Sequence, residues 1–365
     1  MIETVTAAAS AHRDGEGPKP LRPVRVAVAG LGRAGVAHAA VLSTIPGCDV
    51  VAVADPRGAA RAAVRGMGFR ARAFASVRKL LEREKPDAVF VCVAQHERAR
   101  VAGAALEAGA AVLVERPMAR TLEGAAELVR IAAAHQGPLA CGHALAFQPV
   151  FAGAQRTVSE GVIGAVRQAR SSMYLSRFFA PRRGRHRLDP AKVAGGVVAH
   201  FSSDLLLLLV RMMGEPREAR ATWNLLYGRV EDELHAMMTL ANGVEVGFDT
   251  SWSVPGYPRS STVIELEGEH GKLLVSDEAL EIELEHPRMG LPAGATRVLE
   301  SQLPQPARFD LGGEALYLQD ASFLQWVTGG AQPPNDGATA LVAHRVMDAL
   351  YRSACADGIT LRVRE

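Results

Sequence analysis

The stretch from Val24 to Asp55 constrains the fold of this 365-residue chain more than any other part of its sequence. An apolar run is followed by the turn Gly30-Leu31-Gly32-Arg33-Ala34-Gly35, a helix-forming segment and a second apolar run that ends at Asp55. A strand, a glycine turn, a helix and a second strand that ends in an acidic residue predict a dinucleotide-binding unit. The alternative is a glycine-rich turn that binds no ligand.

The residues of the glycine turn each have a physical role in binding a dinucleotide. Gly30 allows a tight turn, Gly32 lets the backbone approach a pyrophosphate, and Gly35 lets the helix pack closely on the strand. The helix that starts at Arg33 and Ala34 presents free N–H groups and the positive end of its dipole to the phosphates. We therefore expect all five residues to lie at the cofactor.

Asp55, 20 residues beyond Gly35, bears on which nicotinamide cofactor is bound. Its carboxylate can accept hydrogen bonds from the adenosine ribose hydroxyls and repels a ribose 2′-phosphate, which favours NAD. Arg33 and Arg57 could instead hold that phosphate, so NADP is the alternative.

Length and composition limit the class of protein. A chain of 365 residues is expected to form two domains, with residues 1–20, polar and rich in Ala, Gly and Pro, as a disordered tail. The 48% hydrophobic and 22% charged fractions and the net charge of +2 predict a soluble protein that binds no nucleic acid. No apolar run is long enough to cross a membrane, and no secretory signal is visible. The four scattered cysteines indicate reduced thiols in a cytoplasmic protein.

Helical and apolar segments alternate after Asp55 and predict a parallel, doubly wound α/β sheet of the Rossmann type over residues 21–149. Ligands of such sheets lie beyond the carboxyl ends of the strands. Two loops therefore join the glycine turn at the cofactor, one after a strand at 88–93 and one after a strand at 111–114. We predict cofactor contacts from the residues of these loops, which are Ala94, Gln95, His96, Glu115 and Arg116.

The pattern changes at Gly164, and residues 150–365 predict an α+β domain with an open-faced, mostly antiparallel sheet. Asn242-Gly243 is a strong hairpin signal between two apolar-polar alternating runs. We expect strands at 166–175, 218–227, 234–240, 244–252, 262–267 and 272–275. One helix, at 195–213, interrupts them, and two late helices, at 314–328 and 338–355, are expected to pack on the first domain.

These motifs resemble the Gfo/Idh/MocA family, named for glucose-fructose oxidoreductase and inositol dehydrogenase, over nearly the whole chain. Residues 104–117 resemble the family's stretch that ends in E-K-P, and residues 142–149 resemble a following G-x-x-x-R-F-x-P stretch. Residues 161–164 match its G-x-I-G, and residues 194–197 open the segment where the family carries G-G-G, then Asp, and His four residues later. The resemblance implies a Rossmann domain followed by an open-faced sheet domain, a nicotinamide cofactor and oxidoreductase chemistry.

The chain departs from these motifs at the positions to which the resemblance assigns chemistry. The family's E-K-P lysine contacts nicotinamide and substrate and assists proton transfer, but the chain has Arg116 there. The family's Asp and His are exchanged, as His200 and Asp204. The remaining departures put Gln95, Arg98 and Ala146 where Asn, His and Arg are common.

A guanidinium stays protonated in proteins, so Arg116 can polarise a substrate oxygen but is a poor general acid or base. We predict that His200 transfers the proton, because an imidazole titrates near physiological pH. Asp204 lies four residues later on the same helix face, where its carboxylate could fix the imidazole tautomer. The alternative is a polar pair on a helix whose other face is core. No further metal ligand is evident beside this pair, so we predict no metal site.

Other polar residues are candidates for contacting the substrate. His143 either lines the site or is a satisfied core histidine, and Tyr174 is a lower-ranked proton donor. The loop at 177–187 is rich in arginine, and its side chains, Arg182, Arg183 and Arg185 among them, could pair with a carboxylate or phosphate of the substrate. A solvated loop or an oligomer contact is the alternative for these arginines.

The sequence thus predicts an NAD(P)-dependent oxidoreductase that moves hydride between nicotinamide and a carbinol or carbonyl carbon of a sugar, cyclitol or related small metabolite. Two other classes stay open: a dinucleotide-binding sensor or partner subunit without turnover, and a non-redox enzyme that uses tightly bound NAD. The resemblance also implies a homodimer or homotetramer.

Overall fold

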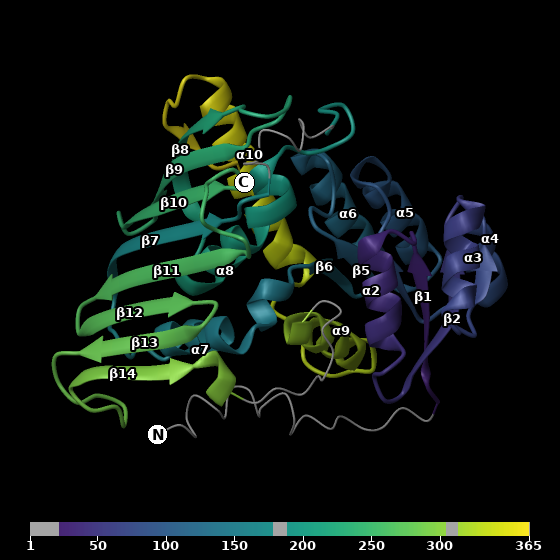
Figure 1. Ribbon diagram of the computed structural model, residues 1–365, viewed down its shortest axis with the longest axis horizontal. Helices are drawn as coiled ribbons and strands as arrows, with labels where there is room; N and C mark the ends of the chain where they lie inside the picture. The colour runs from purple at the N-terminus through teal and green to yellow at the C-terminus, as the bar shows by residue number, and fades with distance from the viewer. Residues whose placement is uncertain (1–21, 178–187, 304–312, 365) are drawn as a thin grey trace. The chain divides into compact units, whose positions relative to one another are not determined.

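Figure 1 shows the computed structural model, which describes residues 22–177, 188–303 and 313–364. These residues form two units. The Rossmann unit contains residues 22–144 and 313–341, and the sheet unit contains residues 145–177, 188–303 and 342–364. Each unit is therefore assembled from stretches that lie far apart in the sequence.

The Rossmann unit is built on a six-stranded sheet in which all neighbouring strands are parallel. The strand order is β3-β2-β1-β4-β5-β6, so the order reverses between β1 and β4, as in doubly wound sheets. The strands are β1 (Val24–Ala29), β2 (Cys48–Ala54), β3 (Arg72–Phe74), β4 (Ala88–Val91), β5 (Ala111–Glu115) and β6 (Leu139–Gly142). The helices that connect them are α2 (Arg33–Leu42), α3 (Gly58–Gly66), α4 (Val77–Glu84), α5 (Gln95–Glu107) and α6 (Leu122–Ala134). The predicted parallel Rossmann sheet is confirmed.

Continuous apolar runs explain why this sheet is buried on both faces. All four residues of β4 are buried, and so are the first four residues of β5. Helix α9 (Gly313–Val327) packs against α2 and contributes Phe323 and Leu324 to the core of the unit. The ring of Phe323 meets that of Phe90 on β4 edge to face, with centroids 5.5 Å apart. A late helix therefore completes a core that begins at β1.

The sheet unit contains a nine-stranded sheet with the order β14-β13-β12-β11-β7-β10-β9-β8-β15. All neighbouring strands in it are antiparallel apart from β7 and β10, which confirms the predicted mostly antiparallel sheet. The strands are β7 (Val166–Tyr174), β8 (Pro216–Asn224), β9 (Glu233–Leu240), β10 (Glu245–Ser251), β11 (Ser261–Gly268), β12 (Gly271–Ser276), β13 (Ala279–Leu284), β14 (Gly294–Leu299) and β15 (Leu361–Arg362). Asn242-Gly243 turns the β9–β10 hairpin as predicted, with Gly243 at a φ of +84°.

Helices cover one face of this sheet. Helix α7 (Pro149–Ser159) packs against β12 and β13, and α8 (Ser203–Met213) packs against β7. Helix α10 (Gly337–Cys355) starts in the Rossmann unit but belongs to the sheet unit from Val342 onward. Its residue Val346 lines a small apolar cavity together with Leu206 and Leu209 of α8. The prediction that both late helices pack on the first domain is therefore corrected for α10.

Several local features differ from the sequence prediction. The helix expected at 195–213 begins at Val198 with a π-helical turn, η2 (Val198–Ser202), before it continues as α8. Strand β8 ends at Asn224 rather than at Tyr227. Strands β3, β13, β14 and β15 and helix α7 were not predicted. Strands β3 and β15 have only three and two residues, which is too short for a periodic signal, whereas β13 alternates apolar residues with glutamate and could have been predicted. The predicted tail, residues 1–20, lies outside the described residues.

Two further observations concern the class of protein. In the described parts of the chain, no helix is both long enough and apolar enough to span a membrane. All four cysteines lie in described segments, and each is a free thiol.

Candidate functional site

The glycine turn between β1 and α2 has the backbone geometry that a pyrophosphate site requires. Gly30 has a φ of +95°, and a Cβ added there would lie 2.6 Å from the carbonyl oxygen of Cys92. A Cβ on Gly35 would lie 1.8 Å from the carbonyl oxygen of Gly30, so helix and turn meet only because Gly35 has no side chain. A Cβ added to Gly32, in contrast, would have no atom of the chain within 4 Å. The space beside Gly32 is open, as close approach of a phosphate needs.

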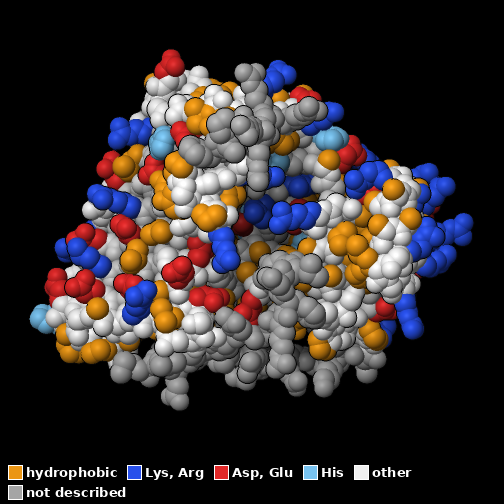
Figure 2. Space-filling view, in the orientation of Figure 1, with side chains coloured by type: hydrophobic (Ala, Val, Ile, Leu, Met, Phe, Trp, Pro, Cys, Tyr) orange, Lys and Arg blue, Asp and Glu red, His pale blue; other side chains and the backbone are white. Residues whose placement is uncertain are grey.

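A cleft of about 1320 Å³ starts at this turn and at the carboxyl ends of β2, β3 and β4, and it runs along α4 and α5 to residues 85–87 and 108–109. It brings together the predicted cofactor residues Gly30, Gly32, Asp55, Arg57, Ala94 and His96. It is also lined by residues 75–78, which the sequence analysis missed because β3, the strand before them, is only three residues long. Lys and Arg side chains gather over α3 and α4 at this side of the unit (Figure 2), and Arg78, Lys85 and Arg100 line the cleft itself. Four carboxylates line it as well, those of Asp55, Glu82, Asp87 and Glu97, so cations and carboxylates are balanced along the cleft.

Asp55 is held by an ion pair at the end of β2. Its carboxylate accepts hydrogen bonds from Nε and a terminal N–H group of Arg57, at 3.0 and 2.9 Å, and from the backbone N–H of Leu31 at 2.8 Å. The side-chain bonds from Arg57, together with the backbone bonds, outweigh partial burial and lower the pKa of Asp55 to about 2. Asp55 is therefore ionised at neutral pH, and Arg57 is the cation beside it. Arg33, the other candidate for a 2′-phosphate, is exposed in the first turn of α2.

This pair leads to a prediction about cofactor choice. Asp55→Asn should raise affinity for NADPH relative to NADH about tenfold, because a carboxylate that repels the 2′-phosphate is removed while Arg57 stays. Arg57→Ala should shift the ratio the other way. Dissociation constants for both reduced cofactors, measured by fluorescence, check this without turnover. Arg65→Ala, on the exposed face of α3, is the matched control; an unchanged ratio in Asp55→Asn would remove Asp55 as the discriminating residue.

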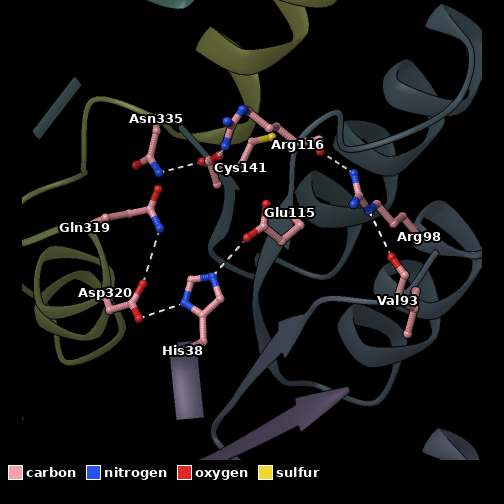
Figure 3. Close-up of polar contacts among 10 residues, drawn as sticks. His38, Val93, Arg98, Glu115, Arg116, Cys141, Gln319, Asp320 and Asn335 are labelled. Carbon is pink, nitrogen blue, oxygen red and sulfur yellow. Dashed lines mark hydrogen bonds and ion pairs between the residues drawn. The ribbon is translucent and has the colours of Figure 1, made fainter. Parts of the chain in front are cut away.

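A chain of buried charges lies behind the carboxyl end of β5 (Figure 3). His38 on α2 is bonded through Nδ1 to Asp320 on α9, at 2.8 Å, and through Nε2 to Glu115 at the end of β5, at 3.2 Å. The side chains of His38 and Asp320 are fully buried, and that of Glu115 is 16% exposed. We call Asp320, His38 and Glu115 the buried charge chain. Sequence reasoning missed two of its members, although His38 is a lone imidazole on an alanine-rich helix face.

The ionisation of this chain follows from its contacts. Burial lowers the pKa of His38, but the carboxylates of Asp320 and Glu115 more than offset it and raise the pKa to about 10. Burial raises the pKa of Glu115, but His38, with Arg116 and Arg98, more than offsets it and lowers the pKa to about 2. At neutral pH the structure therefore holds an imidazolium beside the Glu115 carboxylate.

Arg98 fixes the loop that carries Arg116. Its Nε donates to the carbonyl oxygen of Val93, after β4, at 3.1 Å. One terminal nitrogen donates to the carbonyl oxygens of Arg116 and Pro117, the second at 3.0 Å (Figure 3). The two loops that face the cofactor are thus joined by one guanidinium, at the position where the resemblance led us to expect histidine. The Arg116 side chain is half-buried and donates to the carbonyl oxygen of Gly142 at 3.4 Å.

One group of possible metal ligands occurs in the described part of the chain. Ligand atoms of His38, Cys92 and Glu115 all lie within 4.8 Å of one another. Both ring nitrogens of His38 are already bonded to carboxylates, and this pattern fits a protonated imidazole rather than a metal-bound one. We therefore interpret the group as a hydrogen-bonded network. His200 and Asp204 belong to no such group among the described residues.

His200 lies in the sheet unit on the π-helical turn η2. Such turns are rare in proteins, and where they occur they are often found at functional sites. A buried carboxylate, Glu231, caps the start of this turn. It accepts hydrogen bonds from the backbone N–H groups of Gly196, at 2.7 Å, and Val198, at 3.2 Å. Tyr351 donates to Glu231 at 2.7 Å and accepts from the N–H of Ala199 at 3.2 Å. Two side chains from distant segments, Glu231 and Tyr351, thus fix the first turn of the helix that carries His200.

The close approach at this cap explains the glycines before it. A Cβ on Gly196 would lie 2.0 Å from the carbonyl oxygen of Glu231. His200 is half-buried, with its ring 6.4 Å from that of the fully buried Trp252, while Asp204 is buried, 5% exposed. That Asp204 orients His200 stays a prediction.

The other predicted residues are placed as follows. Gln95 is buried in the first turn of α5, and Ala94 precedes that helix. His143, after β6, is only 2% exposed, so little of its surface is open to a substrate. Tyr174 ends β7, half-buried, with its ring 5.3 Å from that of Tyr257. The three loop arginines, Arg182, Arg183 and Arg185, lie outside the described residues.

Comparison with known proteins decides the family. A model described as "Oxidoreductase family, NAD-binding Rossmann fold" matches residues 24–143, and one described as "GFO/IDH/MocA C-terminal domain" matches residues 151–274. The chain belongs to the Gfo/Idh/MocA family. This membership confirms the predicted fold and oxidoreductase class, and NAD as the cofactor that the Rossmann unit binds.

Individual relatives are more distant. A 1,5-anhydro-D-fructose reductase from Ensifer adhaerens is 28% identical over 231 residues, which cover 62% of this chain and 67% of that protein. A scyllo-inositol 2-dehydrogenase (NAD(+)) from Bacillus subtilis (strain 168) is 33% identical over 148 residues, which cover 39% of this chain and 42% of that protein. The structure of a levoglucosan dehydrogenase in complex with NADH matches 94% of this chain and 100% of its own, with a TM-score of 0.85 at 19% identity. This structural similarity supports the fold of the Gfo/Idh/MocA family.

Proposed function

We propose that this Gfo/Idh/MocA protein transfers hydride between NAD and a carbinol or carbonyl carbon of a sugar, a cyclitol or a related small metabolite. One observation carries the proposal: a cleft of about 1320 Å³ is lined by Gly32, with open space beside it, and by Val93, which Arg98 joins to the backbone of the half-buried Arg116. The names of the two relatives, a reductase of an anhydro sugar and a dehydrogenase of an inositol, support this substrate class.

The chain's own residues have distinct roles in this proposal. The backbone at Gly30, Gly32 and Gly35 binds the pyrophosphate, and Asp55 binds the adenosine ribose. When bound there, the nicotinamide ring would be the hydride acceptor in its oxidised form and the hydride donor in its reduced form. The Arg116 guanidinium polarises the substrate oxygen, since a fixed positive charge stabilises negative charge that develops there.

Proton transfer requires a group that titrates, which a guanidinium does not. The proposal assigns this transfer to His200, with Asp204 orienting its imidazole. The capped turn at Gly196 holds the backbone of His200 in one place, as a proton-transferring group requires.

Absorbance at 340 nm tests the proposal directly. Purified protein is incubated with NAD or NADP and a panel of inositols, aldoses, ketoses and anhydro sugars, and also with NADH and the corresponding ketones. A net change in NADH with at least one cyclitol or sugar is the expected result. Bound cofactor without turnover would instead indicate a sensor or partner subunit. Product without a net change in NADH would indicate non-redox use of tightly bound NAD, and either outcome contradicts the proposal.

A further inference from the structure

The buried charge chain joins three elements of the Rossmann unit that are remote in sequence. His38 lies on α2, Glu115 at the end of β5 and Asp320 on α9, and His38 and Asp320 are separated by 282 positions. Figure 3 shows the imidazole between the two carboxylates, and Gln319 donates to the far oxygen of Asp320 at 3.2 Å. Both ring nitrogens are used, so the ring is fixed in position and in orientation.

This arrangement has a consequence for Arg116, which follows Glu115 directly in the chain. The Glu115 carboxylate lies against Gly142, where its Oε2 would be 3.3 Å from an added Cβ. Arg116 donates to the carbonyl oxygen of the same Gly142. A carboxylate fixed at this point places a negative charge beside the guanidiniums of Arg116 and Arg98 and offsets their mutual repulsion.

We propose that His38 is a positioning residue: it keeps the Glu115 carboxylate ionised and in place, and through it holds the Arg116 guanidinium where the proposed hydride transfer needs it. The inference rests on the proposed function for its catalytic consequence. The ionisation of Glu115 itself can be tested without turnover.

The groups around Glu115 set the direction of the expected pH effects. They are His38 on α2, Cys92 after β4, Arg98 on α5, Arg116 after β5 and Asp320 on α9, while Cys141 on β6 acts on Arg98. Without His38, burial, which raises the pKa of Glu115, is opposed by the two arginines alone. Glu115 then takes up a proton at a higher pH than in the natural protein, where its pKa is about 2.

The test compares His38→Gln with the natural protein between pH 5 and pH 9. In this range His38→Gln should lose kcat/KM toward acid pH, whereas the natural protein should not lose it through Glu115, whose pKa is about 2. Infrared difference spectra should show a buried protonated carboxyl at pH 6 in this variant alone. The band should be lost in the double variant with Glu115→Gln, which identifies the carboxyl. His135→Gln, an exposed histidine at the end of α6, is the matched control and should change neither readout.

Asp320→Asn provides a second variant if His38→Gln does not fold. His38 then keeps only one carboxylate, and its pKa falls from about 10 toward the ordinary value of 6.5. His38 loses its proton, and with it its positive charge, as the pH rises through its pKa. Because that pKa is lower in Asp320→Asn, this variant should lose activity on the alkaline side at a lower pH than the natural protein.

Two results would overturn the inference. One is a loss of activity that merely follows the loss of folded protein, with no carboxyl band and no shift of either pH limb. The other is one equivalent of zinc in the purified protein, found by elemental analysis and absent from both His38→Gln and Cys92→Ser, which would make the cluster a metal site. If no substrate turns over, the infrared result still decides whether His38 keeps Glu115 ionised, so failure of the proposed function is distinguished from failure of this inference.

Discussion

His200→Ala is expected to reduce kcat by roughly 10²- to 10⁴-fold, the usual contribution of a positioned acid or base. His200 is the titratable group on the capped turn, and the fixed charge of Arg116 cannot replace it. The dissociation constant for NADH should change less than about twofold, because the glycine turn and the cleft belong to the Rossmann unit and His200 to the sheet unit. Steady-state kinetics and NADH fluorescence on the same preparation measure both effects.

His286→Ala is the matched control for this prediction, because His286 is an exposed histidine after β13 in the same unit. It should retain full activity. Full activity in His200→Ala would contradict the assignment of proton transfer to His200. Equal losses of kcat and NADH affinity would point to a structural role for the turn at Val198–Ser202 instead.

Gly35→Ala is expected to destabilise the protein by about 3 kcal/mol or more and to abolish NADH binding. The added methyl group would lie 1.8 Å from the carbonyl oxygen of Gly30, and only a shift of the backbone can relieve that overlap. Since a loss of this size lowers the melting temperature by about 10 °C in a unit of this size, differential scanning calorimetry shows it clearly.

Gly32→Ala separates folding from binding. Its methyl group would meet no atom of the chain, so the melting temperature should stay within about 2 °C of that of the natural protein. It would occupy space at the wall of the cleft, so NADH affinity should fall about tenfold or more. Unchanged NADH affinity in Gly32→Ala would show that the pyrophosphate binds elsewhere.

The sequence was sufficient to predict the parallel sheet and the glycine turn at which the cofactor is expected, because both depend on local patterns. Apolar runs such as that of β4 are buried over their whole length, and Gly30 and Gly35 stand where any added side chain would overlap the backbone. Asn242-Gly243 determined the register of one hairpin in the same local way.

Interactions between distant residues could not be predicted. Nothing near His38 in the sequence indicates that its partner is Asp320, and nothing near Gly196 indicates a cap from Glu231. The π-helical turn at His200 was not predicted either, and the side chains that bond to its backbone, Glu231 and Tyr351, are likewise distant in the sequence. The ion pair of Asp55 with Arg57 could have been predicted from the sequence, because the two residues are only two positions apart at the end of one strand.

The contribution of α9 to the Rossmann unit has a consequence for the order of events during synthesis. When a ribosome has released residues 22–144, all six parallel strands are available, but Phe323, Leu324 and Asp320 have yet to be made. Until they emerge, His38 has no second carboxylate and the apolar surface of α2 lacks its cover. Nascent chains that stop before Gly313 should therefore be more sensitive to protease in the Rossmann segment than the complete protein. The core of the Rossmann unit is therefore complete only after α9 has been made.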